Sequence, residues 1–157
     1  MDFTTAKGIL AALEHHGVRY VMVGSMAMAA HGLVRATRDL DIFVAPDDDN
    51  VGRLRAALKS LFDDPSIDEI TGTDLQGDYP AVSYAPPAAD YTLDILSRLG
   101  EAFSFDDIEA EDIDVGGVSV RVATPHMLYR MKKDTVRPQD RADAEALKSS
   151  FALDEES

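Results

Sequence analysis

Apolar residues recur along this chain in two spacings, one typical of helices and the other of short buried strands. Helical spacing predicts a helix from Phe3 to a stop at Gly17, a second over 26–31, and a third that begins after Asp47 or Asp48. Apolar runs bounded by turn residues predict strands over 19–23, 38–44, 81–84, 91–96, 112–115 and 118–122.

Proline placement predicts two helices near the C-terminus, because proline is favoured at the first helical position. Pro125, which follows Thr124, starts a helix to about residue 134, and Pro138 starts another to about residue 151. A short acidic helix is expected from Ser104. Helices thus precede, separate and follow the strands, and no repeat or linker divides them. This order indicates one α/β (α+β) domain over 1–157, a mixed sheet flanked by helices with a helical C-terminal segment.

Composition narrows the class of protein. Hydrophobic residues make up 45% and charged residues 28% of 157 residues, as in a globular domain with one core. The absence of cysteine excludes disulfides and thiolate metal sites, and fits a reducing cytoplasm. The longest apolar run, 20–30, is shorter than the roughly 20 residues of a membrane span, and the N-terminus lacks the pattern of a secretion signal. We therefore expect a cytoplasmic protein without a membrane partner.

Charge is strongly acidic overall but unevenly distributed. The net charge is -14, from 15 basic and 29 acidic side chains, which argues against indiscriminate coating of nucleic acid. Five basic residues nevertheless fall close together near the C-terminus: Arg130, Lys132, Lys133, Arg137 and Arg141. Such a local cationic face on an acidic body could hold a nucleotide or the end of an RNA.

Three aspartates interrupt apolar strands, where a solvated carboxylate is disfavoured. Asp39 and Asp41 are two residues apart, so their side chains share one face of a strand, and Asp94 lies in the strand predicted over 91–96. Close carboxylates repel each other unless a cation or a bound proton intervenes, and Mg²⁺ prefers such oxygen ligands. Carboxylates on neighbouring strands could hold two metals for a phosphoryl-type displacement, and the third could act as a base.

Gly24-Ser25 supplies a complementary feature. A strand that ends in Gly-Ser and opens a helix presents unpaired backbone N–H groups to an anion, and the serine hydroxyl can donate to a phosphate oxygen. An ordinary helix cap would use the same residues. A phosphate-binding turn followed by an acidic pair on the next strand favours the functional interpretation.

The combined pattern resembles the polymerase-beta-like nucleotidyltransferase superfamily, and more closely its AbiEii-type branch from bacterial toxin–antitoxin and abortive-infection systems. The residues that carry the resemblance are Gly24-Ser25, His31-Gly32, Arg35, Thr37, Asp39, Asp41, Asp94, Ala123-Thr124-Pro125, Lys132, Arg137, Asp140 and Asp143. They span about residues 17–147. Gln139 departs from the pattern, since a lysine is common there. His31 fits either an ordering role at the Gly32 turn or a functional one.

The resemblance implies two Mg²⁺ (or Mn²⁺) ions on Asp39, Asp41 and Asp94, with Asp94 also taking the acceptor proton. It implies a nucleoside triphosphate between Gly24-Ser25 and a basic side chain. Lys132 is the best match for the lysine that binds the triphosphate, and Arg35 and Arg38 are further candidates.

The leading hypothesis is therefore an enzyme that moves a nucleoside monophosphate from a triphosphate to a hydroxyl. The acceptor stays open between a tRNA end, a protein and a small molecule, and a toxin–antitoxin role implies a cognate partner protein. The alternative is a non-catalytic binding module or antitoxin-like protein that keeps the fold. Retention of all three carboxylates favours catalysis.

Overall fold

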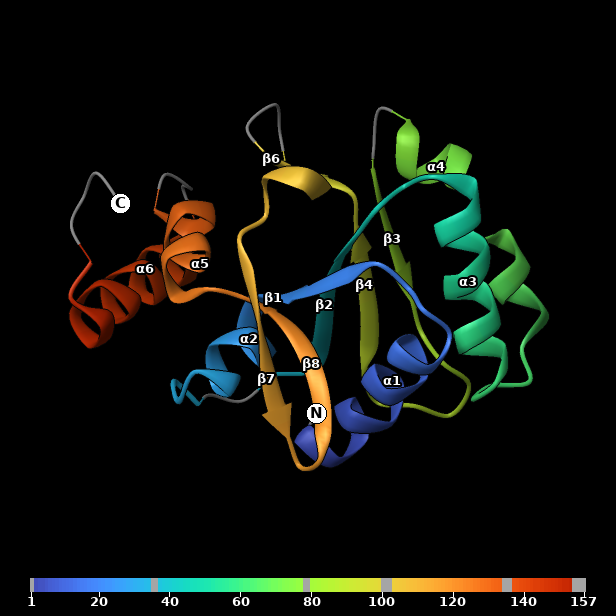
Figure 1. The fold of residues 1–157 in the computed structure, drawn as a ribbon, viewed down its shortest axis with the longest axis horizontal. Coiled ribbons are helices and arrows are strands. Elements are labelled where there is room, and N and C mark those ends of the chain that lie inside the picture. Colours follow the sequence, from blue (N-terminus) through green and yellow to red (C-terminus); the bar gives the residue numbers. More distant parts are fainter. Residues whose placement is uncertain (1, 35–36, 78–79, 100–102, 134–136, 154–157) are drawn as a thin grey trace.

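The computed structural model describes residues 2–34, 37–77, 80–99, 103–133 and 137–153 (Figure 1). Its helices are α1 (Phe3–His15), α2 (Gly24–Ala30), α3 (Asp48–Lys59), α4 (Gly72–Gln76), α5 (Pro125–Lys132) and α6 (Pro138–Phe151), with the 3-10 helices η1 (Pro65–Glu69) and η2 (Phe105–Asp107). Its strands are β1 (Tyr20–Val23), β2 (Asp39–Val44), β3 (Ala81–Tyr84), β4 (Thr92–Leu96), β5 (Arg98–Leu99), β6 (Phe103–Ser104), β7 (Ala110–Val115) and β8 (Val118–Ala123).

Six strands form one mixed sheet in the order β3-β4-β2-β1-β8-β7. β2 runs antiparallel to β1 and parallel to β4. The end of β1 and the starts of β2 and β4 therefore meet at one edge of the sheet. Short β5 and β6 pair separately as an antiparallel ladder. The predicted α/β class with a mixed sheet is confirmed.

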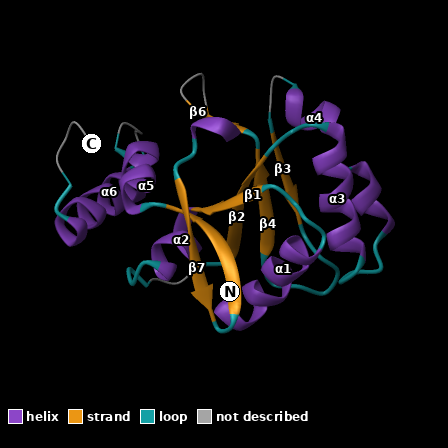
Figure 2. Ribbon diagram, in the orientation of Figure 1, coloured by secondary structure: helices purple, strands orange, loops and turns teal. Residues whose placement is uncertain are grey.

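Helices cover the sheet from two sides and bury its strands (Figure 2). α1 and α3 pack together, as do α5 and α6, and α2 contacts both β1 and β2. In Figure 1, α3 lies to the right of the sheet, and α5 and α6 lie to its left. All four residues of β1 are buried, as are the apolar residues Leu40, Ile42 and Phe43 of β2. This packing gives the edge that carries the aspartates a rigid support.

Most predicted elements form within a residue or two of the expected bounds. Asp47 caps α3 by accepting from Asn50 N, and Thr124 caps α5 by accepting from Met127 N. The acidic helix expected from Ser104 is the single 3-10 turn η2. Two further short helices, η1 and α4, form in the acidic stretch that showed no apolar periodicity. No helix in the described ranges combines the length and the apolar character that a membrane crossing requires.

His31 follows α2 and connects three elements of the fold. Its Nε2 lies 2.8 Å from the carbonyl oxygen of Ala123, at the end of β8. Its ring packs edge-to-face against Phe151 of α6, with 5.9 Å between ring centroids. The side chain is 6% exposed, so these contacts support its ordering role at the turn.

Candidate active site

The three predicted aspartates lie on two neighbouring strands. In the parallel register of β2 and β4, Asp41 is opposite Asp94, and Asp39 is opposite Thr92. Asp41 is also opposite Val23, the last residue of β1. The alternation of strand side chains places Asp39 and Asp41 on one face, while Leu40 and Ile42 enter the core on the other. The aspartates therefore gather at the edge where β1 ends and β2 begins.

Two hydroxyl groups donate hydrogen bonds to these carboxylates. Thr92 Oγ1 lies 2.7 Å from Asp39 Oδ1 and 3.4 Å from Asp94 Oδ1. Ser83 Oγ, on the edge strand β3, lies 2.7 Å from Asp94 Oδ1. Sequence reasoning missed both hydroxyls. The two-residue spacing of Thr92 and Asp94 could have identified the first, because it places both on one face of the strand.

Crowding of the carboxylates changes the acidity of Asp41. Burial raises the pKa of Asp41 to about 7, and the neighbouring charge and hydrogen bond of Asp94 and the charge of Asp39 act in the same direction. The charge of Lys132 opposes this rise. In the metal-free protein, Asp41 therefore stays protonated to a higher pH than an ordinary aspartate does, unless a cation replaces the proton.

Gly24 brings the backbone against Asp41. Its φ is +71°, in the left-handed region that glycine adopts readily. A Cβ at this position would overlap Asp41 Oδ2 and lie 2.9 Å from Asp41 Cγ. A side chain at position 24 is therefore incompatible with the observed placement of Asp41.

A cleft of about 210 Å³ opens over these residues. Its lining residues are Gly24, Ser25, Thr37, Asp39, Asp41, Lys132, Arg137, Gln139 and Asp140. The strand edge supplies the turn and two carboxylates, and the end of α5 and the start of α6 supply the cations. Residues more than 100 positions apart in the sequence therefore share one cavity.

Two of the remaining predicted residues, Asp94 and Arg38, lie outside that lining. Asp94 is next to Asp41 in the sheet but does not line the cleft. Arg38 lines a neighbouring hollow with Tyr91 and Thr92, and Asp39 borders both cavities. Arg35 lies outside the described residues. Arg137, noted in the sequence only as part of the basic cluster and the family pattern, lines the cleft with Lys132.

Lys132 is held in place by acidic residues of α6. Its Nζ lies 2.6 Å from Asp143 Oδ2 and 3.6 Å from Asp140 Oδ1. Asp143 is only 3% exposed, and its other oxygen accepts a hydrogen bond from Gln139 Nε2 at 3.0 Å. The lysine thus enters the cleft from an anchored position rather than as a mobile surface cation.

Asp143→Ala is expected to lower the free energy of unfolding by about 3 kcal/mol, because it leaves the Lys132 charge half-compensated in a buried position. Asp140→Ala, which removes the longer and more exposed partner, should cost less than about 1 kcal/mol. Urea denaturation of the two variants beside the wild type measures both. Equal losses in the two variants would show that the short ion pair contributes no more to stability than the long one.

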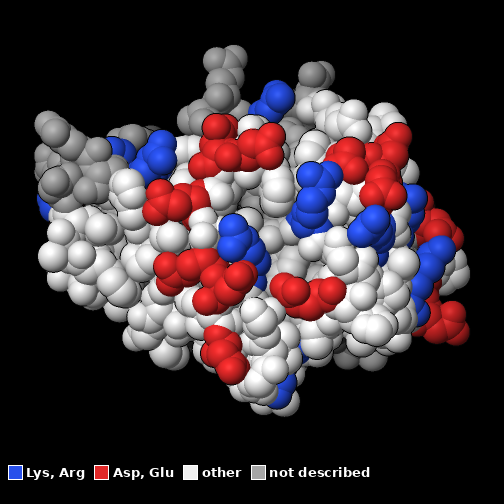
Figure 3. Space-filling model, in the orientation of Figure 1, with Lys and Arg blue, Asp and Glu red and all other residues white. Residues whose placement is uncertain are grey.

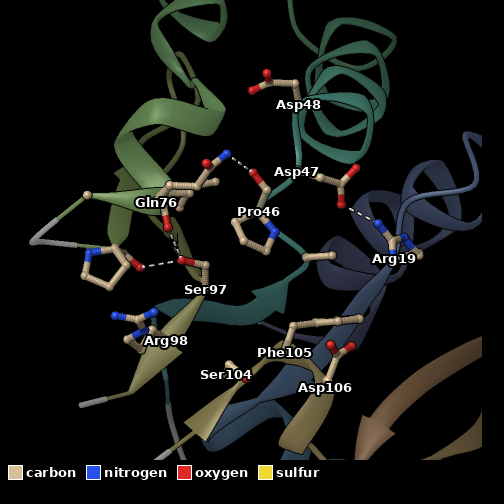
Figure 4. Close-up of a pocket in the computed structure, with 14 residues that line it drawn as sticks. Arg19, Pro46, Asp47, Asp48, Gln76, Ser97, Arg98, Ser104, Phe105 and Asp106 are labelled. Carbon is tan, nitrogen blue, oxygen red and sulfur yellow. Dashed lines mark hydrogen bonds and ion pairs between the residues drawn. The ribbon is translucent and has the colours of Figure 1, made fainter. Parts of the chain in front are cut away.

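A larger cavity of about 590 Å³ lies at the opposite edge of the sheet, beyond the ends of β2 and β4 (Figure 4). Its polar side chains mainly bond to its own walls: Arg19 pairs with Asp47, and Gln76 Nε2 donates to the carbonyl of Pro46 at 2.8 Å. Buried Ser97 donates to the carbonyl of Leu75. Size alone therefore does not make this cavity the candidate site, and the convergence of carboxylates, turn and cations identifies the smaller cleft.

The carboxylates at the cleft fit a divalent cation only if substrate phosphates complete its ligands. Within the described ranges, no three His, Asp or Glu side chains are arranged to hold a metal ion by themselves. Asp39 and Asp41 line the cleft of about 210 Å³ with carboxylate oxygens, and proteins commonly hold Mg²⁺ with one or two carboxylates plus substrate phosphates.

Solved structures with a similar fold are nucleotidyltransferases or resemble them. ANT(2'')-Ia, in complex with adenylyl-2''-tobramycin, aligns with a TM-score of 0.58 at 14% identity, over 95% of this chain and 88% of that one. A nucleotidyltransferase-like protein from Paracoccidioides brasiliensis aligns with a TM-score of 0.57 at 15% identity, over 94% and 76% of the two chains. At these identities the likeness shows the fold. No curated protein gives a significant sequence match.

These likenesses show that the chain has the fold of the nucleotidyltransferases. Residues 8–146 match the family model described as "Nucleotidyl transferase AbiEii toxin, Type IV TA system". Because this match covers most of the chain, the protein belongs to the AbiEii nucleotidyltransferase family. The resemblance seen in the sequence motifs is confirmed at the level of family and enzyme class.

Proposed function

We propose that this protein transfers a nucleoside monophosphate from a nucleoside triphosphate to a hydroxyl group, with a divalent cation, in the cleft over Asp39 and Asp41. The observation that carries the proposal is the direct packing of Gly24 against Asp41 in the same cleft as Lys132 and Arg137. Phosphate-binding backbone, metal-ligating carboxylates and compensating cations therefore occupy one small space. The family membership supports the same reaction class.

The triphosphate would lie between the turn and the cations. Gly24 leaves room for a phosphate to approach the backbone, and Ser25 places its side chain at the same turn. Lys132 and Arg137 face this turn from the helical segment and would neutralise the departing pyrophosphate. Asp140 and Asp143 hold Lys132 in position for this purpose.

The carboxylates would hold the cation and manage the acceptor proton. Asp39 and Asp41 line the cleft and are the proposed metal ligands, with Asp94 completing the set from the next strand. A bound Mg²⁺ or Mn²⁺ would neutralise charge that develops on the reacting phosphate oxygens. Asp94 would accept the proton of the attacking hydroxyl, because it is adjacent to Asp41 and lies outside the lining of the proposed triphosphate cleft.

The biological role that we propose is that of a toxin in a two-component system with a cognate antitoxin, as the family description suggests. The acceptor is a tRNA end, a protein or a small molecule. Acidic side chains are interspersed with basic ones across the face seen in Figure 3, which favours a localised acceptor site over extended contact with nucleic acid. ANT(2'')-Ia was solved with a nucleotidylated small molecule, so the fold accommodates that acceptor class too.

The test is transfer of label from each of the four α-³²P nucleoside triphosphates into purified tRNA and into cell lysate. The reaction should require Mn²⁺ or Mg²⁺, cease with EDTA and resume when metal is added in excess. Nuclease or protease treatment of the labelled product then identifies the acceptor class. Asp41→Asn should not transfer label. Asp63→Asn, at an exposed aspartate in the loop after α3, is its matched control and should transfer label like the wild type.

Absence of transfer to any acceptor, together with absence of metal-dependent triphosphate binding, would contradict the proposal. The fold would then serve to bind a partner protein. Transfer that persists in EDTA would retain the enzyme class and contradict the metal site.

A further inference from the structure

Two hydroxyl side chains outside the cleft contact Asp39, which borders it, and Asp94, which is next to Asp41 in the sheet. Ser83 of β3, Asp94 of β4 and Asp41 of β2 are aligned across three strands, and Thr92 and Asp39 form the adjacent row. The alignment follows from the register, so it depends on backbone hydrogen bonds rather than on flexible side chains. This polar row crosses the sheet at Asp94, whose two neighbours in β4, Leu93 and Ile95, are fully buried.

Each hydroxyl has one proton to donate, and the distances show where each proton goes. Thr92 Oγ1 is 2.7 Å from Asp39 Oδ1 but 3.4 Å from Asp94 Oδ1, so its donation goes to Asp39. Ser83 Oγ donates to Asp94 Oδ1 at 2.7 Å. Oδ1 of each of these two carboxylates therefore accepts a hydrogen bond from a hydroxyl group.

This arrangement matters because the terminal torsion of an aspartate is broad, and a free carboxylate samples many orientations. Hydrogen bonds from outside the coordination shell fix the orientation of metal-ligating side chains and tune their affinity for metal. Asp39 borders the cleft near its mouth and is exposed. Packing alone therefore does not fix its carboxylate.

We propose that Thr92 and Ser83 are positioning residues that orient Asp39 and Asp94 for a divalent cation bound together with the nucleoside triphosphate. The proposal rests on the proposed function of the same site. Neither residue would touch the substrate. Their effect on the reaction would pass through metal affinity, and the hydroxyl group rather than the bulk of the side chain would carry it.

The experiment measures Mn²⁺ affinity by electron paramagnetic resonance on the full chain, with a saturating non-hydrolysable α,β-methylene nucleoside triphosphate. Thr92→Val and Ser83→Ala should each weaken Mn²⁺ binding about tenfold or more, the usual effect of losing an outer-shell partner. Thr92→Ser, which keeps the hydroxyl, should stay within about threefold of the wild type. Thr73→Val, at an exposed threonine of α4, is the matched control for the substitution.

Binding within about threefold of the wild type in both Thr92→Val and Ser83→Ala would overturn the proposal. An equal loss in Thr92→Ser and Thr92→Val would also overturn it, because packing would then be the cause. Ser83 is exposed on an edge strand, so Ser83→Ala tests the idea even if Thr92→Val perturbs the sheet. Failure of the wild type itself to bind Mn²⁺ with triphosphate would refute the proposed function and this inference together.

Discussion

Replacement of Gly24 by alanine is expected to reduce nucleotidyl transfer by about 100-fold or more while the protein remains folded. The methyl group would overlap Asp41 Oδ2 and lie 2.9 Å from Asp41 Cγ, so the carboxylate or the turn must move. A displacement of about 1 Å at reacting groups commonly costs about 100-fold in rate. The positive φ of 71° adds strain of about 1–2 kcal/mol for alanine.

Gly117→Ala separates the two effects of the Gly24 variant. Gly117 also has a positive φ, of 89°, but an added Cβ there meets no atom within 4 Å. It lies in the turn between β7 and β8, away from the cleft. The control should therefore lose stability by about 1–2 kcal/mol and keep its transfer rate. Thermal unfolding and the rate of label transfer are measured on both variants, and a Gly24→Ala protein as active as Gly117→Ala would refute the contact argument.

Gly24 and Asp41 also show how far sequence alone can define such a site. Strand alternation placed Asp39 and Asp41 on one face, and the Gly-Ser turn pointed to the end of the preceding strand. Antiparallel pairing of β1 and β2 then requires that turn and carboxylate meet, since Val23 is opposite Asp41. The shared face and the turn could be predicted from local patterns, whereas the pairing of β1 with β2 that brings them into contact was not predicted.

The cations depend on tertiary packing, which periodicity does not encode. Arg38 is adjacent to Asp39 in sequence, but alternation along the chain sends it to the neighbouring hollow. Lys132 was expected from the family pattern, but its anchoring by Asp143 follows from the packing of α5 on α6. The same packing brings Arg137 to the cleft, a position that no spacing rule in the sequence predicts.

The short helices that sequence reasoning missed have a similar cause. η1 buries only Ile67, and α4 buries Leu75 and Gly72, so neither shows an apolar stripe. Their ends depend instead on local caps, with Asp64 accepting from Ser66 N and Thr71 accepting from Asp74 N. Such caps were present in the sequence, but without periodicity they do not distinguish a helix from a turn.

Asp41→Asn is expected to abolish transfer and yet to stabilise the metal-free protein at pH 8. Burial, Asp94 and Asp39 raise the pKa of Asp41 to about 7 from the ordinary 3.8. The folded state therefore holds a proton that the unfolded state has already lost between about pH 4 and pH 7. Stability consequently falls as the pH rises through this window and levels off above it, where the carboxylate is buried as an anion.

Asparagine removes that charge with little change in shape. At pH 8 without metal, the variant should exceed the wild type by about 2 kcal/mol, or roughly 5 °C in Tm, and the difference should become small near pH 4.5. Mn²⁺ with a triphosphate should raise the Tm of the wild type but not of the variant, because only the wild type gains a bound cation. Transfer should fall about 1,000-fold or more, as for the loss of a direct metal ligand.

Differential scanning calorimetry from pH 4.5 to pH 8 measures this crossover, with Asp63→Asn again as the matched control. The prediction fails if Asp41→Asn is less stable than the wild type at pH 8, or if the stability difference between the two is the same at every pH. Either result would show that repulsion among the carboxylates does not destabilise the folded protein. A stabilised variant that still transfers label would place the metal site elsewhere. Gain of stability together with loss of transfer would show that the Asp41 carboxylate destabilises the fold and is needed for the reaction.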